Sequence, residues 1–329
     1  MSSRPSHGLP RRDGARERPA VIAAGRTRAT RGPRYLALAE SGELARRAAA
    51  AVARLASCDL CPHRCHADRT AGPFGLCCIG RRAVVHGWGP HLGEEPPIRG
   101  TRGSGTVFFS GCNLSCVFCQ NWETSHLRRG RETSPDELAE IMLALQRAGC
   151  HNINLVSPTH VLAQVLEALP IAVDRGLRLP LVWNSGGYDA VDALALLDGV
   201  VDIYMPDAKY GADEPARTLS GAPDYVAVNR AALREMHRQV GDLEIGPDGL
   251  ARRGLLVRHL VLPGRLAASE AVFDFLAREI SPNTAVNVMD QYRPCWRADE
   301  HPPADRPLTR AEFEQALASA RRAGLSRFV

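Results

Sequence analysis

From residue 104 onward, short apolar runs alternate with longer stretches of helical spacing. The apolar runs show little alternation of polar and apolar residues, which is typical of strands buried on both faces of a parallel sheet. We predict six strands, each followed by a helix. The predicted strands are 105–110, 152–157, 181–184, 201–205, 255–262 and 285–289. The predicted helices are 134–149, 161–175, 190–197, 224–240, 269–280 and 310–324.

Two of these helices have clear start signals. Ser134 and Glu137 have the spacing of a capping box with a proline between them, and Thr309 is the expected cap of the last helix. Six strand–helix units, rather than eight, predict an α/β fold of the partial (β/α)6 TIM-like barrel type. In such a barrel, functional side chains gather at the carboxyl ends of the strands.

The first 103 residues differ in composition. Residues 1–34 contain nine arginines against Asp13 and Glu17, and we predict a disordered tail. Residues 35–103 are expected to form a helical lead-in over 35–57 and a cysteine-rich N-terminal segment, ahead of a core domain at 104–329. Glycine and proline are dense in 79–103, which predicts an ordered connector with no helix or strand. Glu94 and Glu95 lie there and are expected in a solvated bend, with a role as catalytic acids as the alternative.

Charge and hydropathy limit the classes of function. The formal net charge is +5, but the tail contributes +7, so the rest of the chain is close to −2. A nucleic-acid role resting on a basic surface therefore has no support. No apolar run is long enough to span a membrane, and we expect a soluble, cytoplasmic protein.

Three cysteines, Cys112, Cys116 and Cys119, directly follow the first predicted strand with the spacing C-x3-C-x2-C. Thiolates this close can bind one soft metal centre, and iron–sulfur clusters are common occupants of such groups. Three ligands would leave one iron of a [4Fe–4S] cluster open to an outside ligand. A structural zinc site and three unrelated core cysteines are the alternatives.

Four more cysteines, Cys58, Cys61, Cys65 and Cys77, have the spacing C-x2-C-x3-C-x11-C in a loop-rich segment. Four thiolates would close a coordination sphere, as in a structural site. A zinc ion and a second iron–sulfur cluster both fit this set, and reduced cysteines in a loop are the alternative. Grouped cysteines in a chain of this size indicate metal sites in a reducing compartment.

Polar residues follow several predicted strands. They are Ser157 and Thr159 after the second strand, Asn184 at the end of the third, and Asp207 and Lys209 after the fourth. Lys209 is the only lysine among 41 basic residues, which indicates a position that needs a compact ammonium.

The fifth predicted strand carries two basic residues, Arg258 and His259, inside an apolar run. A buried guanidinium is costly unless it is paired, so we expect Arg258 to face a carboxylate. Neighbouring residues of a strand point to opposite faces. We therefore expect Arg258 inside the barrel and His259 packed under the helices.

Residues 58 to about 324 resemble the radical S-adenosylmethionine (SAM) superfamily, and within it proteins similar to pyruvate formate-lyase activating enzyme, including the AmmeMemoRadiSam group. The stretches that carry the resemblance are CDLCPHRC, HLGEEPPI, GTVFFSGCNLSCVFCQN, HNINLVSPTH, VDIYMPDAKY, EMHRQVG, GLLVRHLVLPG and VNVMDQYRP. The resemblance implies a partial barrel of the radical SAM type.

The resemblance also implies a chemistry. Cys112, Cys116 and Cys119 would bind a [4Fe–4S] cluster, and SAM would bind the open iron through its amino and carboxylate groups. One electron, from a flavodoxin- or ferredoxin-type donor, would cleave SAM to a 5′-deoxyadenosyl radical that abstracts hydrogen from a substrate.

The resemblance further implies residues that contact SAM. Ser157 and Thr159 stand where related enzymes carry a Gly-Gly-Glu motif that holds the SAM amino group. The other candidates are Asn184, near the ribose, Asp207 and Lys209, which match an Asp-x-Lys motif, and Arg258, which matches an arginine near SAM.

The leading hypothesis is a radical SAM oxidoreductase, and activation of a glycyl-radical partner protein is one reaction open to it. Action on a small molecule or on another protein side chain is one alternative. A non-catalytic iron–sulfur or zinc protein that transfers electrons or scaffolds a complex is the other.

Overall fold

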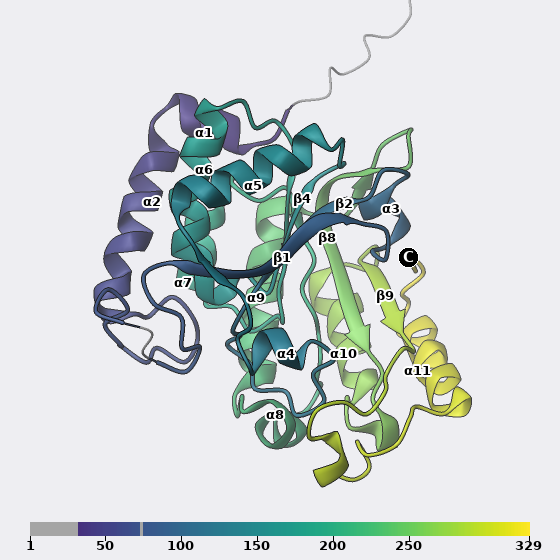
Figure 1. The fold of residues 1–329 in the computed structure, drawn as a ribbon. Coiled ribbons are helices and arrows are strands. Elements are labelled where there is room, and N and C mark those ends of the chain that lie inside the picture. Colours follow the sequence, from purple (N-terminus) through teal and green to yellow (C-terminus); the bar gives the residue numbers. More distant parts are fainter. Residues whose placement is uncertain (1–31, 73–74) are drawn as a thin grey trace, which may run out of the picture. The chain divides into compact units, whose positions relative to one another are not determined.

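The computed structural model describes residues 32–72 and 75–329, and all but the last three residues of the predicted tail lie outside them. Six parallel strands form the centre of the sheet, as predicted (Figure 1). Neighbours in the sheet follow the chain in order. The strands are β2 (Ser104–Phe109), β4 (Ile153–Val156), β5 (Leu181–Asn184), β6 (Ile203–Tyr204), β8 (Ala251–Leu260) and β9 (Ala285–Met289).

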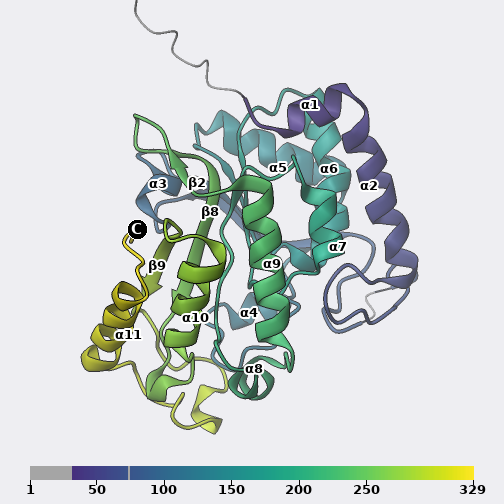
Figure 2. The same ribbon diagram turned by 180° about the vertical axis from the view of Figure 1, so that it is seen from behind.

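Helices follow these strands at the predicted places. They are α5 (Pro135–Arg147), α6 (Leu162–Asp174), α7 (Val191–Leu194), α9 (Tyr225–Val240), α10 (Ser269–Phe275) and α11 (Arg310–Arg322). Complete capping boxes begin α5, at Ser134 and Glu137, and α11, at Thr309 and Glu312. In the view from behind, α9 and α10 lie in front of β8 (Figure 2). The predicted α/β partial barrel is confirmed.

The helical lead-in predicted for 35–57 is also present. It consists of α1 (Tyr35–Glu40), α2 (Glu43–Ala53) and a 3-10 turn at Arg54–Ser57, with α2 packed on α6. Further 3-10 turns lie at Thr159–Val161, Ala195–Leu197, Pro263–Arg265 and Ala298–Glu300, and a π turn at Leu276–Ile280. No helix among residues 32–72 and 75–329 is long and apolar enough to cross a membrane.

The connector predicted for 79–103 was wrong. The segment contains β1 (Ala83–His91), which pairs antiparallel with β2 and with β3 (Arg131–Thr133), and a short helix, α3 (Pro96–Arg99). Gly87, Gly89 and Pro90 give β1 a low strand propensity. Its strand conformation comes instead from backbone pairing with β2, which no local pattern reveals.

Three further short elements were not predicted either. They are α4 (Trp122–Ser125), α8 (Asp213–Ser220) and β7 (Glu244–Ile245). Each is at most eight residues long, too short to show a clear period in the sequence.

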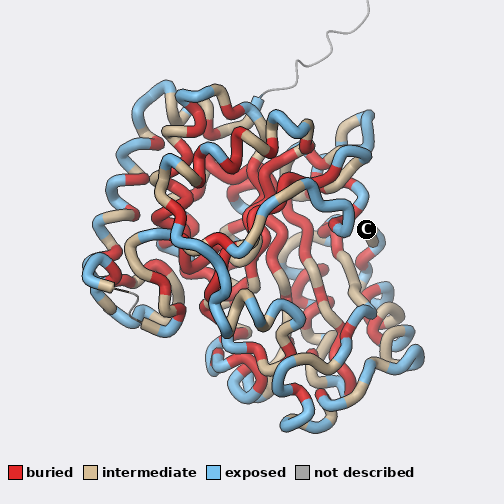
Figure 3. The backbone as a smooth tube through the Cα atoms, in the orientation of Figure 1, coloured by how far each residue is buried: buried red, intermediate tan, exposed pale blue. Residues whose placement is uncertain are grey.

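Residues of the parallel strands alternate between two buried faces, so the strands are buried along most of their length (Figure 3). On one face, Trp183, Tyr204 and Val257 join the large core that includes the helices. On the other, residues of β5, β6, β8 and β9 pack with Ile98 of α3. Ile98 is fully buried, so α3 fills the interior of the barrel at one end.

Candidate active site

The three cysteines after β2 line one cavity. Its volume is about 450 Å³, and Cys112, Cys116 and Cys119 all contribute to its wall. Leu114 and Phe118 of the same loop are buried beside them, and Phe118 packs edge-on against Tyr292 with 5.8 Å between ring centres. Apolar side chains thus surround the thiols on the protein side, as an iron–sulfur cluster requires for tuning of its potential.

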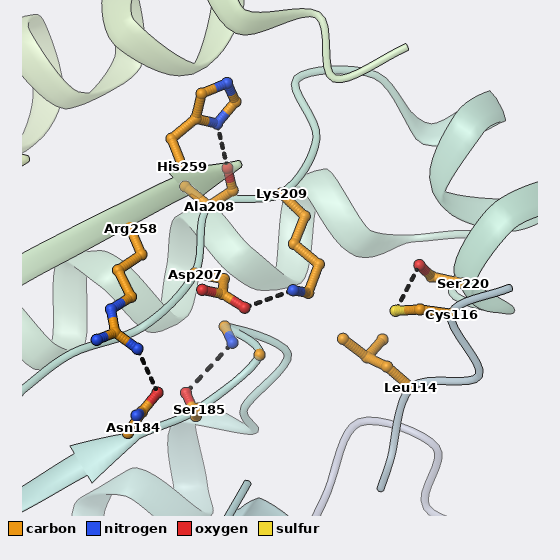
Figure 4. A network of polar contacts seen from close by, with 12 residues as sticks. Leu114, Cys116, Asn184, Ser185, Asp207, Ala208, Lys209, Ser220, Arg258 and His259 are labelled. Carbon is orange, nitrogen blue, oxygen red and sulfur yellow. Dashed lines mark hydrogen bonds and ion pairs between the residues drawn. The ribbon is translucent and has the colours of Figure 1, made fainter. Parts of the chain in front are cut away.

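Each of the three sulfurs has a hydrogen-bond partner. The partners are the Leu114 amide for Cys112 (3.3 Å), the Ser220 hydroxyl for Cys116 (2.9 Å) and the Ser125 hydroxyl for Cys119 (3.2 Å). Figure 4 shows the Ser220 hydroxyl directed at Cys116. Tyr210 extends this network, since its hydroxyl lies 2.7 Å from that of Ser220. Such bonds stabilise a thiolate more than a neutral thiol.

The donor set fits a cluster. Within residues 32–72 and 75–329, no three His, Cys, Asp or Glu side chains converge as the ligands of one metal ion would. A cluster of four irons and four sulfides spreads its thiolate ligands around a larger volume, and three thiols around one cavity suit it. Burial raises the pKa of the Cys112 thiol to about 12, so binding to iron must displace its proton.

Most of the residues predicted from strand ends meet in the same cavity. Ser157, Asn184, Asp207, Lys209 and Arg258 all line it. Ser157 adopts a left-handed backbone conformation, with φ of 55°, and its amide donates to the Asn184 carbonyl (2.9 Å). The ends of β4 and β5 are thereby held together at the cavity wall.

Thr159 lies outside the cavity wall. It begins a 3-10 turn, is buried, and its hydroxyl donates to Asp189 (2.7 Å). Asp189 also accepts from Ser185 (2.6 Å), which belongs to the turn after β5. Thr159 therefore supports that turn, and a contact with SAM is not supported by its position.

Arg258 faces carboxylates inside the barrel, as predicted. Its guanidinium bonds to both oxygens of Glu95 (2.7 and 2.6 Å), to Glu94, and to the Asn184 side chain (3.4 Å). Its side chain is only 16% exposed. Asn287 of β9 adds a bond to Glu95 (2.7 Å).

The solvated bend expected for Glu94 and Glu95 was wrong. Both are buried, because the α3 segment inserts into the barrel and carries them toward Arg258. Burial acts to raise the pKa of Glu95, yet Arg258 holds it below its ordinary value. The need of Arg258 for a carboxylate partner was the sequence signal that could have identified Glu94 and Glu95.

His259 points the other way, as predicted. It is fully buried, and its Nδ1 lies 2.6 Å from the Ala208 carbonyl (Figure 4). Its Nε2 lies 2.8 Å from the Ser269 hydroxyl. Phe273 packs edge-on against its ring. Burial lowers the pKa of His259 to about 4, so this imidazole is a neutral structural residue.

The lone lysine pairs with the aspartate two residues earlier. Lys209 Nζ contacts Asp207 Oδ2, and both side chains are largely buried (Figure 4). Burial acts to lower the pKa of Lys209, but Asp207 and Cys116 raise it above its ordinary value, so the ammonium stays charged. Parallel pairing of Asp207 with Arg258 places this ion pair next to the Arg258 network.

A glycine turn positions the end of β5. Gly187 has a φ of 71°, and a Cβ there would lie 1.9 Å from the Asp207 carbonyl oxygen. Asn229 donates to that same carbonyl (3.0 Å) and to the Gly187 carbonyl (2.8 Å). The turn therefore sets the distance between Asn184 and Asp207 across the cavity.

The four N-terminal cysteines also come together. Cys58, Cys61, Cys65 and Cys77 line one small pocket behind the cluster loop, with Asn113 of that loop in its wall. Burial raises the pKa of the Cys61 thiol to about 12, and the other three thiols are close enough to add to this rise.

Comparison with known sequences defines the family. The Radical SAM superfamily profile matches residues 106–242, a range that holds the three-cysteine loop and the ends of the first four predicted parallel strands. This chain belongs to the radical SAM superfamily. Uncharacterized protein MJ0674 of Methanocaldococcus jannaschii is 36% identical to it over 279 residues, which cover 82% of this chain and 75% of that protein.

Two solved structures are more distant. A radical SAM methyltransferase from Sphaerobacter thermophilus is 18% identical, with a TM-score of 0.44 over 68% of this chain and 66% of that one. TYW1 with a bound lysine–pyruvate adduct is 12% identical, with a TM-score of 0.41 over 66% of this chain and 73% of that one. Membership of the radical SAM superfamily implies an enzyme that uses a [4Fe–4S] cluster and SAM.

Proposed function

We propose that this protein binds SAM in the cavity beside Cys112, Cys116 and Cys119 and uses it to abstract a hydrogen atom from a substrate. The observation that carries the proposal is the meeting of three thiols and an ionised polar wall in one cavity of about 450 Å³. When bound to such a cysteine triad, a [4Fe–4S] cluster supplies the electron that cleaves SAM to methionine and a 5′-deoxyadenosyl radical.

The charge of the cavity suits SAM. Its wall carries three carboxylates, Glu94, Glu95 and Asp207, against the two cations Lys209 and Arg258. SAM has a sulfonium, an ammonium and a carboxylate, and so a net positive charge at neutral pH. An excess of one negative charge in a partly buried wall therefore favours SAM electrostatically.

Individual residues have distinct roles in this proposal. Asn184 and Ser157, at the ends of adjacent strands, offer polar groups to the ribose and the amino group. Lys209 offers its ammonium to the SAM carboxylate, while Asp207 keeps that ammonium charged. Arg258 is already bonded to two glutamates, so its role is to hold the wall rather than to bind a carboxylate.

We propose a glycine residue of a partner protein as the substrate, because the cysteine loop and its flanking motifs resemble those of pyruvate formate-lyase activating enzyme. A one-electron donor of the flavodoxin or ferredoxin type is the second partner required. Hydrogen abstraction from the glycine would yield 5′-deoxyadenosine and a glycyl radical.

The test of the SAM chemistry is anaerobic. The full chain is reconstituted with iron and sulfide, reduced with dithionite and incubated with SAM, and 5′-deoxyadenosine and methionine are measured. We expect both products in equal amounts, and none from a Cys112→Ala, Cys116→Ala, Cys119→Ala triple variant. Absence of cleavage by the reconstituted protein, together with an EPR spectrum that SAM leaves unchanged, would contradict the proposal.

The glycine substrate is tested separately with purified pyruvate formate-lyase as the probe. We expect the doublet EPR signal of a glycyl radical only when this protein, SAM and reductant are all present. SAM cleavage without that doublet would exclude pyruvate formate-lyase as a substrate and favour a small molecule or another protein side chain.

A further inference from the structure

The N-terminal cysteine group contains a buried charge that the described residues do not balance. Arg69 is 1% exposed and lines the same pocket as the four thiols. Its guanidinium donates to the carbonyls of Ile79 (2.7 Å), His160 (2.8 Å) and Gly80 (3.4 Å), and to Cys58 Sγ (3.5 Å). Within residues 32–72 and 75–329, no carboxylate lies within 4.0 Å of it.

An unpaired buried guanidinium is expensive, and proteins normally supply an anion for it. The side chain bonded to Arg69 in this pocket is the Cys58 thiol, which is neutral unless it loses its proton. Four thiolates on one [4Fe–4S] cluster in its common oxidised state carry a net charge of −2. A metal–thiolate centre would therefore supply the negative charge that Arg69 lacks.

The geometry of the pocket agrees with that assignment. Cys58 and Cys77 are buried, while Cys65 is exposed. Gly75 has a φ of 83°, and a Cβ there would lie 2.8 Å from Cys65 Sγ, so the chain passes close to the sulfur where only glycine fits. Thiolates are soft ligands, and four of them in one pocket favour a soft metal centre.

The pocket is directly joined to the cluster loop. His63 Nε2 lies 2.7 Å from the Asn113 carbonyl, and Asn113 follows Cys112. On the other side of the loop, Gly111 packs so closely on the Cys77 carbonyl that a Cβ would lie 2.9 Å from it. Gly111 and Asn113, the two chain neighbours of Cys112, are thus both in contact with the N-terminal cysteine segment.

We propose that Cys58, Cys61, Cys65 and Cys77 hold a second iron–sulfur cluster, and that this centre fixes the position of the Cys112 loop. The metal site stands independently of the SAM chemistry, whereas its effect on the loop rests on the proposed function. Metal binding releases the thiol protons and leaves a negative charge beside Arg69.

The first test uses the full chain with Cys112, Cys116 and Cys119 changed to alanine, so that only the N-terminal group can bind metal. After iron–sulfide reconstitution, we expect about four irons per chain, because these thiols do not converge as the ligands of a single metal ion would. Visible and X-ray absorption spectra distinguish a cluster from zinc, and a zinc ion in place of a cluster would contradict the assignment. No metal above the level of a variant that also carries Cys61→Ala and Cys65→Ala would overturn it.

The second test measures the effect on the loop. Cys61→Ala with Cys65→Ala in the otherwise natural chain should release iron from the first cluster to a chelator at least about tenfold faster, because support outside the ligand shell typically changes metal affinity by 10–100-fold. Cys78→Ala is the matched control, since Cys78 neighbours Cys77 but does not line the pocket. Equal release rates in all three proteins would overturn the role in positioning.

A further variant distinguishes loss of metal from loss of folding. Cys65→Ala alone removes an exposed side chain and leaves buried Cys58 and Cys77 in place. It should lower the metal content of the N-terminal group while the circular dichroism spectrum stays unchanged. If SAM cleavage is absent even in the natural chain, the proposed function fails while the metal measurement of the first test still decides the second centre.

Discussion

At the scale of single residues, side chains far away in the sequence complete the cysteine triad. Ser220 is 104 positions from Cys116, yet its hydroxyl donates to that sulfur at 2.9 Å. A hydrogen bond to a cluster sulfur stabilises the reduced, more negative state and raises the reduction potential. Ser220 is therefore a residue that tunes the cluster without ligating it.

Ser220→Ala should make the cluster harder to reduce. We expect the reduction potential to fall by an amount on the order of tens of millivolts, with the iron content unchanged. Redox titration followed by EPR is the measurement. Ser115→Ala is the control, because Ser115 is an exposed residue of the same loop, and an equal shift in both variants would rule out a specific role for Ser220.

The buried network of Arg258 predicts a pH dependence. Glu95 is 4% exposed and its pKa lies below the ordinary value of 4.5, because Arg258 outweighs the effect of burial. The ion pair therefore stabilises the fold fully at neutral pH, and this stabilisation is lost as the pH falls below about 4.5 toward the folded-state pKa.

Glu95→Gln should lower the free energy of unfolding by about 1–3 kcal/mol near neutral pH. The difference from the natural chain should shrink as the pH falls below about 4.5, and urea unfolding at several pH values would measure it. Glu270→Gln, in an exposed pair with Arg265, should change stability by less than about 1 kcal/mol. A difference that grows toward acid would contradict the assigned pKa direction.

At the scale of elements, the turn after β5 shows how backbone shape sets the site. Gly187 combines a left-handed φ with close approach to the Asp207 carbonyl. Gly176, after α6, has a φ of 97° but open space around it. Alanine substitutions at these two glycines therefore distinguish two free-energy costs. Both substitutions strain the backbone, and only the one at Gly187 also crowds neighbouring atoms.

Gly176→Ala should cost about 1–2 kcal/mol, the strain of a left-handed alanine. Gly187→Ala adds a collision with backbone atoms and should cost roughly 3–5 kcal/mol. Chemical denaturation of both variants is the measurement. Equal losses would mean that the chain relaxes around Asp207 and that the turn does not fix the cavity width.

At the scale of the whole molecule, six strands and the segment before β2 contribute residues to the wall of the cavity. Glu94 and Glu95 come from the α3 segment, the thiols follow β2, and polar groups lie on or directly after β4, β5, β6, β8 and β9. A ligand that contacts so many elements should stabilise the fold as a unit.

SAM should therefore raise the melting temperature of the anaerobically reconstituted protein. At a SAM concentration about 100 times its dissociation constant, the expected stabilisation is about 2.7 kcal/mol. Differential scanning fluorimetry with and without SAM would measure it. The Cys112→Ala, Cys116→Ala, Cys119→Ala variant should show a much smaller shift, and an equal shift there would mean that SAM binds away from the thiols.

The sequence by itself determined the local and periodic features. Apolar runs located the six parallel strands, and the capping residues located the starts of α5 and α11, because these signals lie within a few residues. The alternation of side chains along a strand also placed Arg258 and His259 on opposite faces. Cysteine spacing identified both thiol groups, since ligands to one centre are close along the chain.

Only the tertiary structure decided which distant groups meet. The insertion of α3 into the barrel brings Glu94 and Glu95 to Arg258, and no local pattern encodes a contact across more than 160 residues. The pairing of β1 with β2, the approach of Ser220 to Cys116 and the burial of Arg69 beside four thiols have the same origin. Each follows from packing of whole elements, which depends on the complete chain rather than on neighbouring residues.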